Sequence, residues 1–139
     1  MSIHLWNRSE KMAPRILVVD DDRALQTLLS VLFTRAGFEC DFVSDGVEAM
    51  EKLDGDGDGN GQSYAVIMLD LILPGISGMQ ILEHLEEKNP ALLPRTIVLT
   101  GASGGVLKGL DTSRVHAVIR KPFDIQDVLN LTAECAYRE

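Results

Sequence analysis

The chain has 139 residues, of which 45% are hydrophobic and 24% charged, so it can fold as one globular domain around a core without disulfide bonds. Its formal net charge of −8 argues against direct binding of nucleic acid, because contact with phosphates needs a basic face. Residues 1–15 lack the apolar core of a signal peptide and no apolar run is long enough to span a bilayer, so we expect a cytoplasmic protein without membrane contact.

The first elements follow an N-terminal extension of residues 1–14 and open one domain of residues 15–137. The run RILVVD (15–20) is apolar and ends in acid, which indicates a strand covered on both faces. A helix that ends near Gly37 follows, because apolar residues recur at helical spacing. These residues are Leu25, Leu28, Leu29, Leu32 and Phe33.

The middle of the chain continues the alternation of strands and helices. Residues 38–44 (FECDFVS) predict a second strand and residues 45–53 (DGVEAMEKL) a second, short helix. A Gly/Asp-rich insertion at 54–63 separates this helix from the apolar run YAVIMLD (64–70), which predicts a third strand closing on an aspartate. Ser77 caps a third helix, which must end near the proline that follows Asn89.

The last part of the chain predicts two further strands and two further helices. The strands are TIVLT (96–100) and VHAVIR (115–120). The segment 101–113 between them holds four glycines and predicts a short fourth helix, while Asp124 caps a final one. Five buried strands that alternate with helices predict an α/β fold, a doubly wound parallel sheet with helices on both faces.

Ligands of such sheets bind beyond the carboxyl ends of the strands, so the residues at those ends form the candidate site. They are Asp20, Asp21, Asp70, Thr100 and Lys121. Three crowded carboxylates repel one another unless a cation is bound or they are protonated, and a hard oxygen site with few protein ligands suits Mg²⁺. Lys121 supplies a point charge for a phosphate. The pattern therefore indicates phosphoryl transfer to a carboxylate.

The chain resembles the receiver domains of bacterial response regulators, a family with a flavodoxin-like, CheY-like (βα)5 fold. The matching stretches lie in the family's order: ILVVDDD (16–22), VIMLDLILPGISGMQIL (66–82), TIVLTGAS (96–103) and VIRKPF (118–123). The resemblance implies a member of a two-component phosphorelay that takes its phosphoryl group from a phosphohistidine. The donor is then a sensor histidine kinase or a phosphotransfer protein. The only chemistry implied is self-phosphorylation and self-dephosphorylation, so the chain is not a conventional enzyme.

The resemblance also assigns roles to individual residues. Asp70 becomes the phosphoacceptor, and Mg²⁺ is held by Asp21, Asp70 and the backbone carbonyl of Ile72, while Asp20 acts largely through water. Lys121, whose bond to Pro122 is expected to be cis, pairs with the phosphoryl oxygens. Thr100 moves to hydrogen-bond one of them. Asp22 is expected to cap the first helix rather than bind the metal. Signalling is expected through the face of the fourth helix, fifth strand and final helix, which contacts a downstream protein or a second copy in a homodimer.

Departures from the family pattern fall around the predicted switch. Val118 replaces the usual aromatic switch residue, so the signal must depend more on the backbone and on the loop that contains Gly104 and Gly105. Ile72 and Ala102 occupy the two variable positions that flank the phosphoryl group. Because both are apolar, neither can orient an attacking water, and we expect slow self-dephosphorylation.

Four other interpretations account for parts of the same sequence. The Gly/Asp-rich insertion resembles the first half of a calcium loop, but the position that needs a bidentate glutamate is Ala65, inside the third strand. Asp20, Asp22, Thr100 and Lys121 follow the order of a haloacid-dehalogenase-type phosphatase, which leaves Asp70 unexplained. A receiver that acts without phosphorylation is compatible with Val118. Nucleotide binding through GASGG is disfavoured because its glycines do not fit G-x-G-x-x-G.

Overall fold

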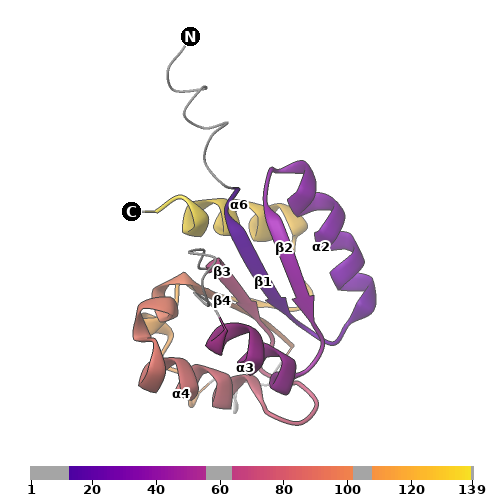
Figure 1. The fold of residues 1–139 in the computed structure, drawn as a ribbon. Helices are drawn as coiled ribbons and strands as arrows, with labels where there is room; N and C mark the ends of the chain where they lie inside the picture. The colour runs from indigo at the N-terminus through magenta and orange to yellow at the C-terminus, as the bar shows by residue number, and fades with distance from the viewer. Residues whose placement is uncertain (1–12, 56–63, 102–107, 139) are drawn as a thin grey trace.

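The computed structural model describes residues 13–55, 64–101 and 108–138. Within this part of the chain a single parallel sheet runs through the molecule in the strand order β2-β1-β3-β4-β5 (Figure 1). The strands are β1 (Arg15–Val19), β2 (Glu39–Val43), β3 (Tyr64–Leu69), β4 (Thr96–Thr100) and β5 (Ala117–Arg120). Because the order reverses at β1, the first helical crossover lies on one side of the starting strand and the next on the other, which makes the sheet doubly wound.

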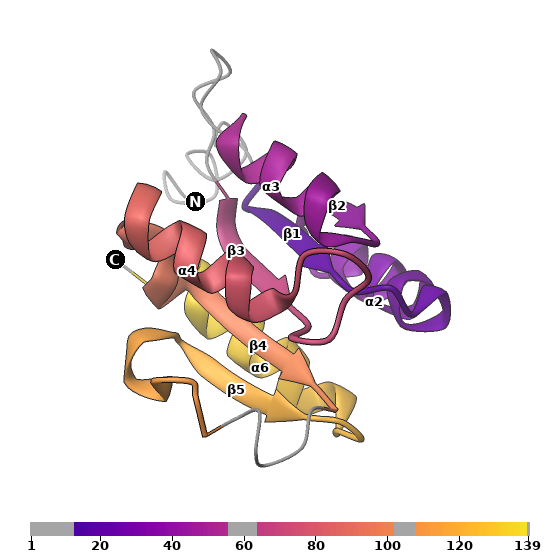
Figure 2. The same ribbon diagram turned by 90° about the horizontal axis from the view of Figure 1, so that it is seen from below.

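Helices cover both faces of the sheet. They are α2 (Arg23–Arg35), α3 (Gly46–Asp54), α4 (Gly78–Lys88) and α6 (Ile125–Ala136), with two 3-10 helices, η1 (Pro90–Arg95) and η2 (Thr112–Arg114). Figures 1 and 2 show α3 and α4 over one face, and α2 and α6 over the other. No helix of the described residues is long and apolar enough to cross a bilayer.

The sheet divides the interior into two hydrophobic cores, because successive side chains of a strand point to opposite faces. Leu17 and Val19 pack with the residues of α3 and α4, while Ile16 and Val18 pack with those of α2 and α6. All four are fully buried. This is why the central strands β1 and β3 are nearly continuous apolar runs, whereas the edge strand β2 alternates polar and apolar residues.

Short polar side chains fix where the helices begin. Asp22, Asp45 and Asp124 each accept a hydrogen bond from a backbone N–H in the first turn of α2, α3 and α6. Ser77 and Gln80 form a capping box at the start of α4, each satisfying a backbone N–H of the other. The expected caps at Asp22, Ser77 and Asp124 are therefore confirmed.

The predicted fold class is confirmed, and the differences are local. Strands β2 and β5 are shorter than expected, spanning Glu39–Val43 and Ala117–Arg120. Of the predicted fourth helix, the described residues hold only a turn and the 3-10 helix η2. Leu28 was placed in the buried stripe of α2 but is 45% exposed, because a stripe at i, i+3, i+4, i+7 and i+8 is wider than the face that meets the sheet. Most of the extension and of the Gly/Asp-rich insertion, residues 1–12 and 56–63, lies outside the described residues.

Candidate functional site

The ends of four strands come together at one edge of the sheet, as the sequence predicts. Backbone hydrogen bonds extend the ladders by one residue beyond the strands: Asp20 N donates to Val43 O at 3.1 Å, and Asp70 N to Val19 O at 2.9 Å. Lys121 N donates in the same way to Thr100 O at 2.9 Å. The residues at the candidate site are thereby held as rigidly as the strands themselves.

Asp70 occupies the centre of this edge. Its side chain is almost fully buried, with only 7% of its surface exposed. One carboxylate oxygen, Oδ1, accepts hydrogen bonds from the Thr100 hydroxyl at 2.9 Å and from Ile72 N at 3.0 Å. The other, Oδ2, accepts from Lys121 Nζ at 3.1 Å. A buried carboxylate with one cationic and two neutral donors is oriented in a single way.

Asp20 shares the same lysine. Lys121 Nζ donates to Asp20 Oδ2 at 2.8 Å, and Asp22 N donates to Asp20 Oδ1 at 2.8 Å. Burial nevertheless raises the pKa of the Asp20 carboxyl above its usual value, because the hydrogen bonds from Lys121 and Asp22 only partly offset the loss of solvation. At Lys121, burial alone would lower the pKa of the ammonium group. The hydrogen bonds to Asp20 and Asp70 outweigh this effect, so the pKa is raised.

Asp21 completes a cluster of three carboxylates. Ligand oxygens of Asp20, Asp21 and Asp70 all lie within 4.8 Å of one another, and Asp21 is the exposed member. The ammonium group of Lys121 pairs with two of these three carboxylates, which leaves an excess of negative charge where two of the carboxylates are buried. Hard carboxylate oxygens around an open side are the donor set that Mg²⁺ prefers, so the residues present fit this ion. Lys121-Pro122 is a cis peptide bond, as the resemblance implies.

Other predicted residues surround this cluster at different levels of exposure. Asp22 does not turn toward the carboxylates, because its Oδ1 accepts from Leu25 N at 3.1 Å as the helix cap. Ile72 is 58% exposed beside Asp70, and Val118 is half-buried against the core under α3 and α4. The remaining predicted positions, Ala102, Gly104 and Gly105, lie outside the described residues.

Two glycines that the sequence pattern does not mark as functional, Gly46 and Gly78, allow the loop after β3 to pack closely against the first turns of α3 and α4. A β-carbon on Gly78 would overlap the carbonyl oxygen of Asp70 and the Cα of Leu71. One on Gly46, at the start of α3, would overlap the backbone and side chain of Ile76. Sequence alone gives no sign of these contacts, because a glycine at the start of a helix is common without them.

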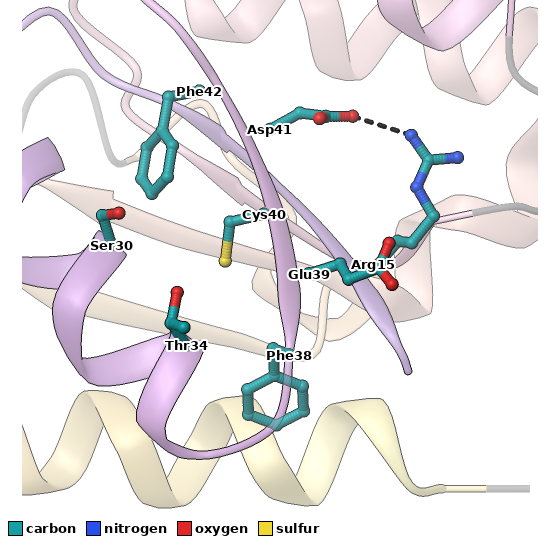
Figure 3. Close-up of a pocket in the computed structure, with 8 residues that line it drawn as sticks. All are labelled: Arg15, Ser30, Thr34, Phe38, Glu39, Cys40, Asp41 and Phe42. Carbon is teal, nitrogen blue, oxygen red and sulfur yellow. Dashed lines mark hydrogen bonds and ion pairs between the residues drawn. The ribbon is translucent and has the colours of Figure 1, made fainter. Parts of the chain in front are cut away.

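An open cavity of about 560 Å³ lies elsewhere, in the groove between α2 and the edge strand β2 (Figure 3). Eight residues line it: Arg15, Ser30, Thr34, Phe38, Glu39, Cys40, Asp41 and Phe42. Burial and the neighbouring Asp41 carboxylate raise the pKa of the Cys40 thiol to about 11, so the thiolate that would act as a nucleophile is scarce at neutral pH. The convergent charges lie at the acidic cluster and not in this groove, so we assign the chemistry to the cluster.

A doubly wound sheet with a buried aspartate and an acidic cluster that fits a divalent cation at its carboxyl edge is the arrangement of a phosphoacceptor domain. Residues 16–133 match the family described as the response regulator receiver domain. The chain belongs to this family, whose function is to accept a phosphoryl group on an aspartate in two-component signalling.

Curated relatives share the domain but are longer proteins. The DNA-binding dual master transcriptional regulator RpaA of Synechocystis is 30% identical over 84% of this chain and 46% of its own length. The transcriptional regulatory protein TcrA of Mycobacterium tuberculosis is 32% identical over 82% of this chain and 42% of its own. The chain thus spans less than half the length of both.

Solved structures agree with the fold. The response regulator protein TrrA of Thermotoga maritima, in complex with Mg²⁺ and BeF, is 28% identical with a TM-score of 0.71, over 88% of this chain and 98% of that one. A CheY-like receiver domain protein of Methanospirillum hungatei has a TM-score of 0.75 at 23% identity, over 89% of this chain and 94% of that one, and shows the fold alone.

Proposed function

We propose that Asp70 is the phosphoacceptor of residues 15–137, the receiver unit of the chain, and that phosphorylation needs Mg²⁺ bound by the acidic cluster. One observation carries this proposal: the buried Asp70 carboxylate accepts hydrogen bonds from Thr100 and Lys121 and lies next to the carboxylates of Asp20 and Asp21. A purely structural carboxylate would have no use for this excess of like charge.

The transfer breaks the N–P bond of a phosphohistidine and forms an O–P bond to Asp70. The attacking electron pair comes from the carboxylate, and the pair of the broken bond returns to the imidazole. Asp20, Asp21, Asp70 and the carbonyl of Ile72 would hold Mg²⁺, which when bound offsets the charge of the phosphoryl oxygens. Lys121 Nζ lies 2.8 Å from an oxygen of Asp20 and 3.1 Å from one of Asp70. Its positive charge would pair with the phosphoryl oxygens after transfer.

The partners follow from the same chemistry. A histidine kinase or phosphotransfer protein of the cytoplasm would supply the phosphoryl group, and a downstream protein would read the phosphorylated form. The switch would include Thr100, which already contacts Asp70, and Val118, which pairs with Val98 of the neighbouring strand β4. The domain would bind no nucleic acid itself and catalyse no reaction other than those at Asp70.

The test is the intact mass after incubation with acetyl phosphate and Mg²⁺, for wild type and Asp70→Asn. Asp41→Asn, which changes another partly buried carboxylate outside the cluster, is the matched control. We expect one phosphoryl adduct on wild type and on Asp41→Asn, lost without Mg²⁺, and none on Asp70→Asn. An adduct that persists on Asp70→Asn would refute the assignment and point to Asp20.

A further inference from the structure

Gln26, in the first turns of α2, joins two loops at the acidic edge. Its side-chain Nε2 donates to the carbonyl of Asp20 at 2.5 Å and to the hydroxyl of Ser44 at 3.2 Å, with the carbonyl of Val43 at 3.4 Å. Two of these partners are carbonyls, which only accept, so the amide nitrogen and not the amide oxygen must face them. The contact therefore links the β1–α2 loop to the β2–α3 loop through a neutral donor.

The bond to Asp20 fixes a peptide plane that the metal site depends on. The carbonyl of Asp20 and the N–H and Cα of Asp21 belong to one planar unit, so a restraint on the carbonyl also fixes the position of the Asp21 Cα from which the side chain extends. The side chain of Asp20 is already held by Lys121 and Asp22. The Asp21 carboxylate, in contrast, accepts no hydrogen bond from the described part of the chain, so in this part of the chain it is restrained through its backbone.

The other end of the link is well anchored. Ser44 follows directly on β2, and its N–H donates to Glu48 in the first turn of α3 at 3.2 Å. Helix α3 itself begins at Gly46, whose Cα lies against Ile76 in the loop that follows Asp70. Movement of Gln26 or Ser44 would therefore be resisted by the packing of α3 on this loop.

We propose that Gln26 is a positioning residue for the metal: it holds the Asp20–Asp21 peptide so that the Asp21 carboxylate faces the ion. This inference rests on the proposed function, since it assumes that Asp21 is a Mg²⁺ ligand. A neutral amide suits the role because it restrains the loop without adding a charge that would compete with the cation.

The test is the substitution Gln26→Met, which keeps the length and helix propensity of the side chain but removes its donors. Mg²⁺ affinity is measured by calorimetric titration of the full chain, and stability by urea unfolding in EDTA. Because groups that orient metal ligands affect affinity by about tenfold or more, we expect the dissociation constant for Mg²⁺ to rise by about tenfold. The urea midpoint should stay close to that of wild type.

Two further variants sharpen the test. Gln126→Met is the matched control, because Gln126 lies early in α6 and its side chain donates only to Asn130, at 2.9 Å, among the described residues. It should leave both measurements unchanged. Ser44→Ala removes one acceptor but leaves the bond to the Asp20 carbonyl in place, so it should weaken Mg²⁺ binding less than Gln26→Met does.

If Gln26→Met binds Mg²⁺ as tightly as wild type, the proposed role of Gln26 is wrong. It is also wrong if the loss of Mg²⁺ affinity is matched by an equal loss of stability, because that indicates a merely structural contact. Wild type that binds Mg²⁺ but takes up no phosphoryl group would refute the proposed function and leave the inference on Gln26 standing. Wild type that binds no Mg²⁺ would overturn both.

Discussion

Two partly buried groupings of carboxylate and cation illustrate opposite uses of charge in this molecule. At the start of β1 and in β2, Arg15 and Asp41 form a balanced pair: Asp41 accepts from Arg15 at 2.7 Å and from the Tyr64 hydroxyl at 2.6 Å. The guanidinium also stacks 4.7 Å from the centre of the Tyr64 ring. At the carboxyl edge, Lys121 pairs with both Asp20 and Asp70, and the carboxylate of Asp21 lies beside them.

The directions of the pKa shifts follow this difference. At Asp41 burial alone would raise the pKa, but the hydrogen bonds from Tyr64 and Arg15 outweigh it and lower the pKa below the usual value. At Asp20 burial prevails and the pKa is raised. Asp20 also accepts two hydrogen bonds, but it is more deeply buried and lies beside two further carboxylates, so its charge reduces stability and provides a place for a cation. Burial and the crowding of like charges thus separate the functional carboxylate from the structural one.

The largest effect that tests this comparison concerns the two cations. Lys121→Met should slow phosphoryl uptake from acetyl phosphate by about a hundredfold or more, the usual cost of losing one donor aimed at a reacting anion. Arg15→Met should leave the rate close to that of wild type, because Arg15 contacts Asp41 and not the cluster. The measurement is the initial rate of adduct formation by intact mass. A wild-type rate in Lys121→Met would show that the lysine is structural.

A second test compares the carboxylates themselves in EDTA. Asp41→Asn should lower the free energy of unfolding by about 1–2 kcal/mol, because it weakens two charge-assisted hydrogen bonds at a partly exposed site. Asp20→Asn should raise the melting temperature, because it removes one of three repelling carboxylates. Both are measured by thermal and urea unfolding.

The control for these substitutions is Asp124→Asn. Asp124 caps α6 from an exposed position, and asparagine caps as well as aspartate, so only the loss of one charge from an acidic chain remains. Loss of stability in Asp20→Asn would contradict the view that the cluster holds excess charge.

The smallest effect is the pH dependence of the Asp41 contribution. A carboxyl group whose folded pKa is lowered contributes stability that is fully present above its unfolded pKa, near 3.8, and is lost as the pH falls through the folded pKa. The difference in stability between wild type and Asp41→Asn should therefore be constant from neutral pH down to about pH 4 and shrink below it. Urea unfolding over this range measures it, and a difference that shrinks well above pH 4 would refute the assigned shift.

The sequence predicts which side chains meet at the carboxyl edge because their placement is a necessary result of the fold. Apolar runs that end in Asp20, Asp70 or Thr100 place these residues at strand ends, and parallel strands bring their ends to one edge. Nothing further is needed to predict which side chains meet. The distances and the sharing of Lys121 require coordinates.

What the sequence does not predict are contacts with backbone atoms and compact turns. Gln26 bonds to carbonyls and a hydroxyl up to 18 positions away, and such contacts leave no periodic pattern. The 3-10 helix η1 was not predicted because Pro90 and Pro94 indicate a break. Leu92 and Leu93 nevertheless bury all but 4% and 5% of their surface, and close the core beneath α4.

The partition of the interior by the sheet has a consequence for redesign. Neighbours in sequence such as Val18 and Val19 contact different sets of residues. Substitutions that change side-chain volume in the core under α2 and α6 are therefore separated by the backbone of the sheet from those in the core under α3 and α4. Substitutions without shared partners combine additively. One side could therefore be repacked for thermal tolerance while the other, which carries the loop after Asp70, keeps its native sequence.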